Sequence, residues 1–159
     1  SGRTTLDRLN GYQSALREAG LALHDDYLYQ VAGGDPSLGA ASVAYYRGLA
    51  EPPTAIVCFN DTLAIGVLAG CRAEGLRVPE DISVTGFDNI PFAAYTCPPL
   101  TTFDQPKYAI GAEAAVLLLN LLRDGNGQAP DTQEVKVLKG RLLVRGSSSP
   151  LSNTSQRSK

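Results

Sequence analysis

The 159-residue chain contains few of the residues on which metal and disulfide sites depend. It has a single histidine and three cysteines, Cys58, Cys71 and Cys97, with no CxxC spacing. An odd number of cysteines without that spacing indicates neither a closed disulfide framework nor a zinc cage, and reduced thiols are typical of a cytoplasmic protein. We therefore expect no metal, no cofactor and a cytoplasmic location.

Positive charge and long apolar runs are also scarce. Lys and Arg number 14 against 16 Asp and Glu, which gives a formal net charge of -2. A chain without a positive excess is not expected to bind nucleic acid by itself. No run approaches the roughly 18 apolar residues that a membrane span needs, and the first residues show neither a basic start nor a hydrophobic signal core. We expect no membrane partner.

The composition is otherwise that of an ordinary globular domain, with 43% hydrophobic and 19% charged residues. Such a chain can bury a core of its own. Only the tail from Ser147, SSSPLSNTSQRSK, lacks the apolar content to fold. We expect residues 147–159 to be disordered and residues 1–146 to form the folded domain.

Segments with helical spacing of apolar residues alternate with short apolar or β-branched runs. The predicted helices cover residues 4–19, 37–50, 60–74 and 106–122. The predicted strands cover residues 27–31, 55–59, 82–87 and 101–103, followed by 134–138 and 141–145 around a tight turn at Lys139–Gly140. This alternation predicts an α/β fold with three layers, in which helices flank a mostly parallel sheet.

Polar residues follow the predicted strands at the points where each strand ends. They are Asp35, Asn60, Asp88 and Gln105, and Arg8 on the first helix could lean over the same edge. Ligands of open α/β sheets bind outside the carboxyl ends of the strands. A carboxylate, an arginine fork and amide groups suit a neutral small molecule that is rich in hydroxyl or amide groups.

Structural roles remain open for several of these residues. Asp35 and Asn60 each stand where a helix needs an N-cap, and Thr4 is spaced with Asp7 as in a capping box. Arg8 could be a solvated helix residue. Asp88 is followed by no periodic helix that it could cap, so the alternative for it is the formation of a turn.

The motifs favour binding over catalysis. No G-x-S-x-G elbow is present, the lone His24 has no nucleophile at a suggestive spacing, and Gly33-Gly34 lacks the further residues of a phosphate loop. Asp88 could act as a phosphoacceptor only beside an acidic pair that holds a metal ion, and no such pair follows another strand. We predict that the chain is not an enzyme.

Three motifs at fixed spacing carry a family resemblance: NDTLAIG, GLRVPEDISVTGFDN and PPLTTFDQP. The segment Pro53–Leu119 that contains them resembles the effector-binding core of the LacI/GalR family of bacterial transcription regulators. The flanking segments TLDRLNGYQSAL and EVKVLKGRLLVRGSSS resemble that family too. The resemblance implies a type I periplasmic-binding-protein fold, in which two Rossmann-like lobes hold an effector in the cleft between them.

The resemblance also implies roles for individual residues. Arg8, Asn60 and Asp88 match residues that hold a sugar or purine-type effector, whereas Thr4 and Gln105 match positions near the cleft. One position departs from the family pattern, because Pro36 stands where an aromatic side chain commonly stacks on the ligand. The apolar wall would then come from elsewhere, for example from Phe59 or Phe87.

The resemblance covers only the C-terminal part of the family's effector-binding domain, namely its second lobe and a crossover helix at 106–123. We therefore expect the chain to be a fragment. Operator DNA would be bound only through a helix-turn-helix domain that precedes Ser1, and the crossover helix would pack on the first lobe. Residues 91–99, with Phe92 and Tyr95, resemble the family's dimerisation region, so we expect a homodimer.

Two other functions remain open at this point. A sugar-binding protein of a transport system would share the fold and the motifs around Asn60 and Asp88. An enzyme on a flavodoxin-like sheet is the second alternative.

Overall fold

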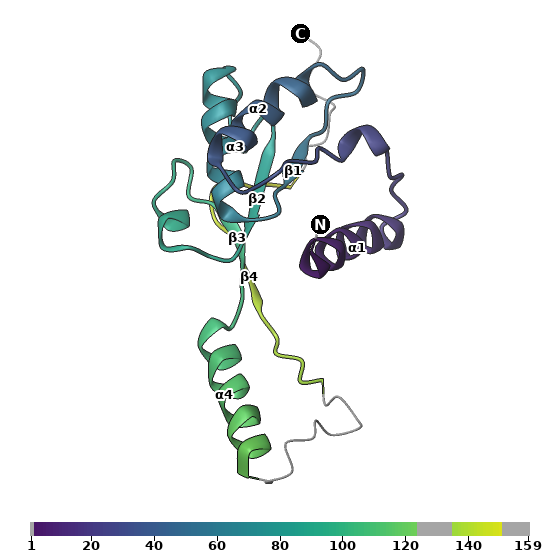
Figure 1. Cartoon of the computed structure of the whole chain (residues 1–159). Coiled ribbons are helices and arrows are strands. Elements are labelled where there is room, and N and C mark those ends of the chain that lie inside the picture. Colours follow the sequence, from purple (N-terminus) through teal and green to yellow (C-terminus); the bar gives the residue numbers. More distant parts are fainter. Residues whose placement is uncertain (1, 124–134, 151–159) are drawn as a thin grey trace.

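The sheet of the computed structural model has four strands in the order β1-β2-β3-β4. The structure describes residues 2–123 and 135–150. The strands β1 (Ala55–Val57), β2 (Ser83–Phe87) and β3 (Thr101–Asp104) are parallel, and β4 (Arg141–Leu143) is antiparallel to β3. The chain is therefore an α/β protein with a mostly parallel sheet and flanking helices, as the sequence predicts (Figure 1).

Four α-helices accompany the sheet in the described ranges, with short 3-10 turns at Asp25–Tyr27 and Pro91–Ala94. The helices are α1 (Arg3–Glu18), α2 (Pro36–Arg47), α3 (Asp61–Ala73) and α4 (Lys107–Arg123). Helix α3 packs on β2, and α2 packs on α3. The core lies between these elements and includes Val43, Val67 and Val84.

Helices α1 and α4 contribute no side chain to this core, because neither contains a buried residue. Helix α4 lies below the sheet in Figure 1, joined to it by the chain that leaves β3 and by the chain that returns to β4. Its exposed apolar side chains are Ile110, Val116, Leu117, Leu118, Leu119, Leu121 and Leu122. The described residues therefore leave most of the apolar surface of α4 exposed.

Glycines allow the backbones of α2 and α3 to touch. A Cβ atom at Gly66 would lie 1.8 Å from the carbonyl oxygen of Pro36, and one at Gly39 would lie 2.2 Å from the carbonyl oxygen of Leu63. No side chain could move to relieve these contacts, since both partners are backbone atoms. The close approach of α2 and α3 thus requires glycine at both positions.

The predicted caps of α2 and α3 are confirmed. Asp35 accepts a hydrogen bond from the Ser37 backbone N–H at 2.8 Å, and Asn60 accepts one from the Leu63 N–H at 2.9 Å. The predicted capping box on α1 is wrong. The N-cap of α1 is Gly2, without a side-chain hydrogen bond, so Thr4 lies inside the first turn.

The predicted strand at 27–31 is also wrong, because this segment follows a 3-10 turn and pairs with no strand. The hydroxyl groups of Tyr45 and Tyr46 on α2 donate to the carbonyl oxygens of Asp26 and Tyr27. The aromatic ring of Tyr29 contacts both of those tyrosine rings, at centroid distances of 5.0 and 6.1 Å. Aromatic residues that suggested a strand instead pack this segment onto α2.

The late hairpin is absent from the described residues as well. Residues 135–138 form no strand, and Lys139–Gly140 makes no turn between two strands. A Cβ atom at Gly140 would lie 2.6 Å from the carbonyl oxygen of Asp104, so Gly140 lies against the end of β3. The returning chain pairs with β3 rather than with residues 135–138.

The expectation of disorder from Ser147 is wrong for the first residues of the tail. Ser147 is completely buried, and its hydroxyl donates to the carbonyl oxygen of Val84 at 2.6 Å and accepts from the N–H of Thr101 at 2.8 Å. Ser149 continues the contact through its N–H, which donates to the Ser83 hydroxyl. Hydrogen bonds to two strands replace the missing apolar content. Residues 151–159 lie outside the described part of the chain.

The contact between α2 and α3 predicts the effect of adding one methyl group. Gly66→Ala should lower the free energy of unfolding by about 1–3 kcal/mol, because the two helices must move apart. The measurement is urea unfolding followed by circular dichroism.

Gly11→Ala on α1 is the matched control, since a Cβ atom there meets nothing within 4 Å. This variant should be as stable as the wild type or slightly more stable, because alanine has the higher helix propensity. Equal effects of the two substitutions would contradict the account of this contact.

Candidate ligand-binding site

Arg8 on α1 reaches the carboxyl edge of the sheet. Its Nη2 atom lies 3.2 Å from Oδ1 of Asp88, and its Nη1 atom donates to the carbonyl oxygen of Phe59. The side chain is only 19% exposed. Arg8 is thus no solvated surface residue, and it joins the ends of β1 and β2.

Two aromatic rings hold the guanidinium group of Arg8. Its Cζ atom lies 4.4 Å from the ring centroid of Phe59 and 3.8 Å from that of Phe87. The Phe87 ring in turn packs on Phe103, with the ring centroids 4.9 Å apart. An arginine over aromatic faces is attracted by their negative quadrupoles, which fixes the direction of its donors. The aromatic residues therefore help to orient Arg8 toward Asp88.

The chain turns sharply where β2 ends. Asp88 and Asn89 have φ angles of 103° and 47°, which are uncommon for residues other than glycine and are found most often for Asp and Asn. The N–H of Asp88 is held by the carbonyl oxygen of Phe103 at 3.0 Å. Asp88 consequently forms the turn and also presents its carboxylate at the edge of the sheet, so both readings of this residue apply.

Only one of the two carboxylate oxygens of Asp88 accepts hydrogen bonds from the described residues. Gln105 donates to Oδ1 at 2.6 Å, and Arg8 donates to the same oxygen. Oδ2 accepts no hydrogen bond from any residue that the structure describes, and the side chain is 32% exposed. Oδ2 is therefore free to accept a hydrogen bond from a ligand.

Asn60 stands next to Phe59 at the start of α3. Its Oδ1 atom caps the helix, and its amide N–H groups donate no hydrogen bond to the residues that the structure describes. The Nδ2 atom lies near Gly34, where a Cβ atom would come within 3.6 Å of it. Capping and ligand binding are compatible for this residue, because they use different atoms.

Two other candidates are not brought into contact with Asp88. Asp35 is exposed and accepts hydrogen bonds from the hydroxyl and the N–H of Ser37, which hold the pKa of its carboxyl below the ordinary value. Thr4 is exposed and forms no side-chain hydrogen bond with the described residues. It lies one helical turn before Arg8, on the same face of α1.

The structure adds a polar network that the sequence reasoning missed. Asn89 donates to Asp104 at 3.2 Å and accepts from Arg145 at 2.9 Å. Asp104 also pairs with Lys107 and Arg141, and the pKa of its carboxyl is lowered chiefly by the hydrogen bond from Asn89. The motif PPLTTFDQP places Asp104 directly before Gln105, which could have drawn attention to it.

The two buried cysteines carry unreactive thiols. Burial raises the pKa of Cys58 to about 12 and that of Cys71 to about 11, so both thiols stay protonated at neutral pH. Across residues 2–123 and 135–150, no group of three or more His, Cys, Asp or Glu side chains could hold a metal ion. Within the same ranges, no helix is both long and apolar enough to cross a membrane.

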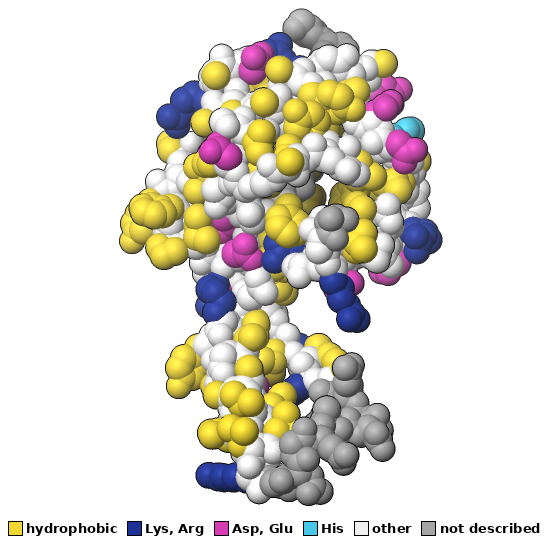
Figure 2. Space-filling view, in the orientation of Figure 1, with side chains coloured by type: hydrophobic (Ala, Val, Ile, Leu, Met, Phe, Trp, Pro, Cys, Tyr) yellow, Lys and Arg dark blue, Asp and Glu magenta, His cyan; other side chains and the backbone are white. Residues whose placement is uncertain are grey.

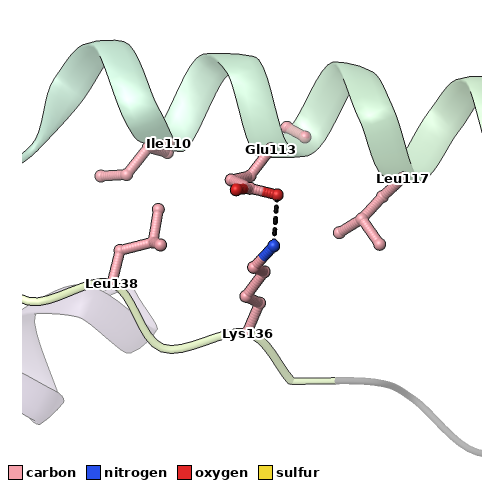
Figure 3. A pocket seen from close by; sticks show the side chains of 6 residues that line it. Ile110, Glu113, Leu117, Lys136 and Leu138 are labelled. Atoms are coloured by element: carbon pink, nitrogen blue, oxygen red, sulfur yellow. Dashed lines mark hydrogen bonds and ion pairs between the residues drawn. The ribbon is translucent and has the colours of Figure 1, made fainter.

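A separate pocket of about 330 Å³ lies between α4 and the segment at 135–138. Glu113 and Lys136 form an ion pair across it, between the apolar side chains of Ile110, Leu117 and Leu138 (Figure 3). It contains none of the residues at the edge of the sheet. Figure 2 shows hydrophobic side chains gathered on this lower part of the molecule.

Comparison with known proteins finds transcription repressors among the relatives of this chain. Residues 2–148 match the family described as periplasmic binding protein-like domain. The HTH-type transcriptional repressor CytR of Escherichia coli is 40% identical over 149 residues, which are 91% of this chain and 41% of that protein. The HTH-type transcriptional repressor PurR of Aliivibrio salmonicida is 41% identical over 123 residues, or 76% of this chain and 36% of that protein. The chain thus spans about two fifths of these relatives.

Solved structures agree with this relationship. A putative transcriptional regulator LacI from Bacillus cereus subsp. cytotoxis superposes with a TM-score of 0.83 at 31% identity, over 91% of this chain and 50% of that one. The transcriptional regulator CelR in a complex with cellobiose gives a TM-score of 0.77 at 31% identity, over 90% of this chain and 42% of that one. The chain belongs to the periplasmic-binding-protein-like domain family, in the form found in the LacI family of transcription regulators.

Proposed function

We propose that the chain is the effector-sensing part of a LacI-type transcription regulator. A small molecule binds at the carboxyl edge of the sheet, and a helix-turn-helix domain outside this chain changes its affinity for operator DNA. The observation that carries this proposal is the carboxylate of Asp88, which Arg8 and Gln105 hold by one oxygen while the other stays free. The names of the relatives support the regulatory role.

The groups at the edge define the chemistry of the effector. Oδ2 of Asp88 can accept hydrogen bonds, the amide of Asn60 can donate them, and the ring of Phe59, which is 40% exposed, offers apolar surface. A carbohydrate or a nucleobase-like compound combines donors with a flat or ring-shaped apolar face. The cellobiose in the CelR structure is in keeping with the first of these classes.

The second wall of the cleft would come from a first lobe that packs on α4. Support for this lies in the apolar side chains that α4 exposes around its whole circumference. Gln105 and Lys107, which lead into α4, bind the side chain and the carbonyl oxygen of Asp88. An effector that contacts Asp88 would then favour one arrangement of the lobes, and only such a difference in affinity can drive a switch.

A homodimer completes the proposal. The loop from Pro91 to Pro99 exposes Phe92 by 72% and Tyr95 by 86%. It is nevertheless held firmly, since Ala93 is fully buried and its carbonyl oxygen accepts from the N–H of Leu100 at 2.8 Å. Exposed aromatic side chains on a rigid support are typical of a protein interface.

The two alternative functions predict different observations. A sugar-binding protein of a transport system would have an export signal before the binding domain, whereas a regulator has a helix-turn-helix domain there and works in the cytoplasm. An enzyme would need turnover that Asp88→Asn abolishes while binding persists. The repressors among the relatives favour the regulator over both alternatives.

The assignment of Asp88 predicts a selective loss of binding. The full-length protein would be titrated by calorimetry with D-ribose, cellobiose, adenosine and hypoxanthine. Asp88→Asn should weaken binding of whichever compound binds by about tenfold or more, because a charged acceptor is lost. Asparagine is the right substitution, since it tolerates the positive φ angle of Asp88.

Asp26→Asn is the control, because it removes an exposed carboxylate far along the chain from the site. It should leave the dissociation constant unchanged. If Asp88→Asn binds as tightly as the wild type, the assignment of Asp88 is wrong. If the wild type binds none of the four compounds, the assigned ligand class is wrong.

The dimer makes a further prediction. Replacing Phe92 and Tyr95 together by serine should turn the full-length protein into monomers at micromolar concentration, as measured by analytical ultracentrifugation, because both exposed rings leave the interface. Leu21→Ser, which changes a side chain that is 60% exposed elsewhere, should leave the dimer intact. A double variant that stays dimeric would exclude this surface as the interface.

A further inference from the structure

Asp61, the first residue of α3, is completely buried, and its two carboxylate oxygens bind different parts of the chain. Oδ2 accepts a hydrogen bond from the N–H of Ile90 at 2.8 Å. Oδ1 accepts one from the hydroxyl of Thr102 on β3 at 2.5 Å. A single buried carboxylate thus connects the start of α3 with β3 and with the loop that follows β2.

Gly86 on β2 makes room for this carboxylate. A Cβ atom at Gly86 would lie 2.2 Å from Oδ1 of Asp61 and 3.0 Å from a methyl carbon of Leu100. Any other residue at this position would therefore displace the carboxylate. The glycine of the motif GFDN and the aspartate of the motif NDTLAIG form a matched pair in space.

The same carboxylate holds the turn in which Asp88 lies. Three successive backbone N–H groups are bound there: that of Asp88 to the carbonyl oxygen of Phe103, that of Asn89 to the hydroxyl oxygen of Thr102 at 3.3 Å, and that of Ile90 to Asp61. Thr102 accepts from Asn89 and donates to Asp61. Two of the three anchors therefore end at Asp61, one directly and one through Thr102.

These hydrogen bonds hold residues whose backbone conformation is unfavourable. Asp88 and Asn89 both have positive φ angles, a conformation that persists only where surrounding contacts hold it. The carboxylate of Asp88 meets Arg8 and Gln105 from this turn. Asp61 also directly follows Asn60. Two neighbouring residues thus supply the amide proposed to donate a hydrogen bond to the ligand and the carboxylate that holds the turn of Asp88, the proposed acceptor.

We propose that Asp61 is the positioning residue of the binding site, and that it acts through Thr102 to fix the turn of Asp88 and Asn89. It touches no ligand itself. The effect on ligand affinity rests on the proposed function, whereas the effect on the turn does not.

The test uses four variants of the full-length protein. Thr102→Val removes the hydroxyl at nearly constant shape, Thr102→Ser keeps it, and Asp61→Asn removes the charge. Ser147→Ala is the control, because it deletes another completely buried hydroxyl, which has two hydrogen bonds, one to β2 and one to β3. It therefore reports a general loss of stability.

Hydrogen–deuterium exchange, measured by mass spectrometry on the peptide that covers residues 86–91, reads the turn without any ligand. Thr102→Val and Asp61→Asn should lose protection there, since hydrogen-bonded amides exchange only when they open. Thr102→Ser and Ser147→Ala should keep it. Retained protection in Thr102→Val, or an equal loss in Ser147→Ala, would overturn the proposal. Because Thr102→Val preserves the buried carboxylate, the proposal stays testable if Asp61→Asn fails to fold.

Calorimetric titration with D-ribose, cellobiose, adenosine and hypoxanthine then reads the consequence for binding. Thr102→Val should bind about 2- to 10-fold more weakly than Thr102→Ser, which corresponds to the loss of one hydrogen bond. Unchanged affinity in a variant that has lost protection would contradict the positioning role. If no variant and no wild-type protein binds any compound, the proposed ligand class fails, while the exchange result still decides the anchoring of the turn.

Discussion

The pairing of Arg8 with Asp88 connects helix α1 with the carboxyl edge of the sheet. Helix α1 has no buried residue, and its Arg8 contacts that edge through Phe59, Phe87 and the carboxylate of Asp88. Parallel strands bring their carboxyl ends to one edge, and the edge is where these groups meet. The geometry of the candidate site thus follows from the direction of the strands and from Arg8, whose side chain extends from α1 to the edge of the sheet.

The site is also connected to the part of the chain that leaves the sheet. Gln105 and Lys107 bind Asp88, and Asp104 gathers Asn89, Lys107 and Arg141 at the point where the chain departs from β3 and returns to β4. Any change at Asp88 therefore reaches the base of α4 within one or two hydrogen bonds. A domain that converts ligand binding into a movement of lobes needs such a connection.

Much of this could be predicted from local patterns. Asp35 and Asn60 were recognised as caps, and Asp88 as a residue at the end of a buried strand, because these signals lie in a few neighbouring residues. The prediction of a strand at 27–31 is wrong because tyrosines on α2 bind that segment. The local sequence does not predict that Ser147 is ordered, because its hydrogen-bond partners are the distant residues Val84 and Thr101. The network of Asp61, Gly86 and Thr102 likewise joins three separate motifs, so only the folded chain brings it together.

The central claim is that the carboxyl edge of the sheet forms one wall of a ligand cleft. A crystal structure of the full-length protein with a bound effector tests this claim most directly. The account predicts a hydroxyl or amide group of the effector at about 3 Å from Oδ2 of Asp88, with Arg8 still between Phe59 and Phe87. An effector bound instead in the pocket between α4 and residues 135–138, with Asp88 unchanged, would contradict it.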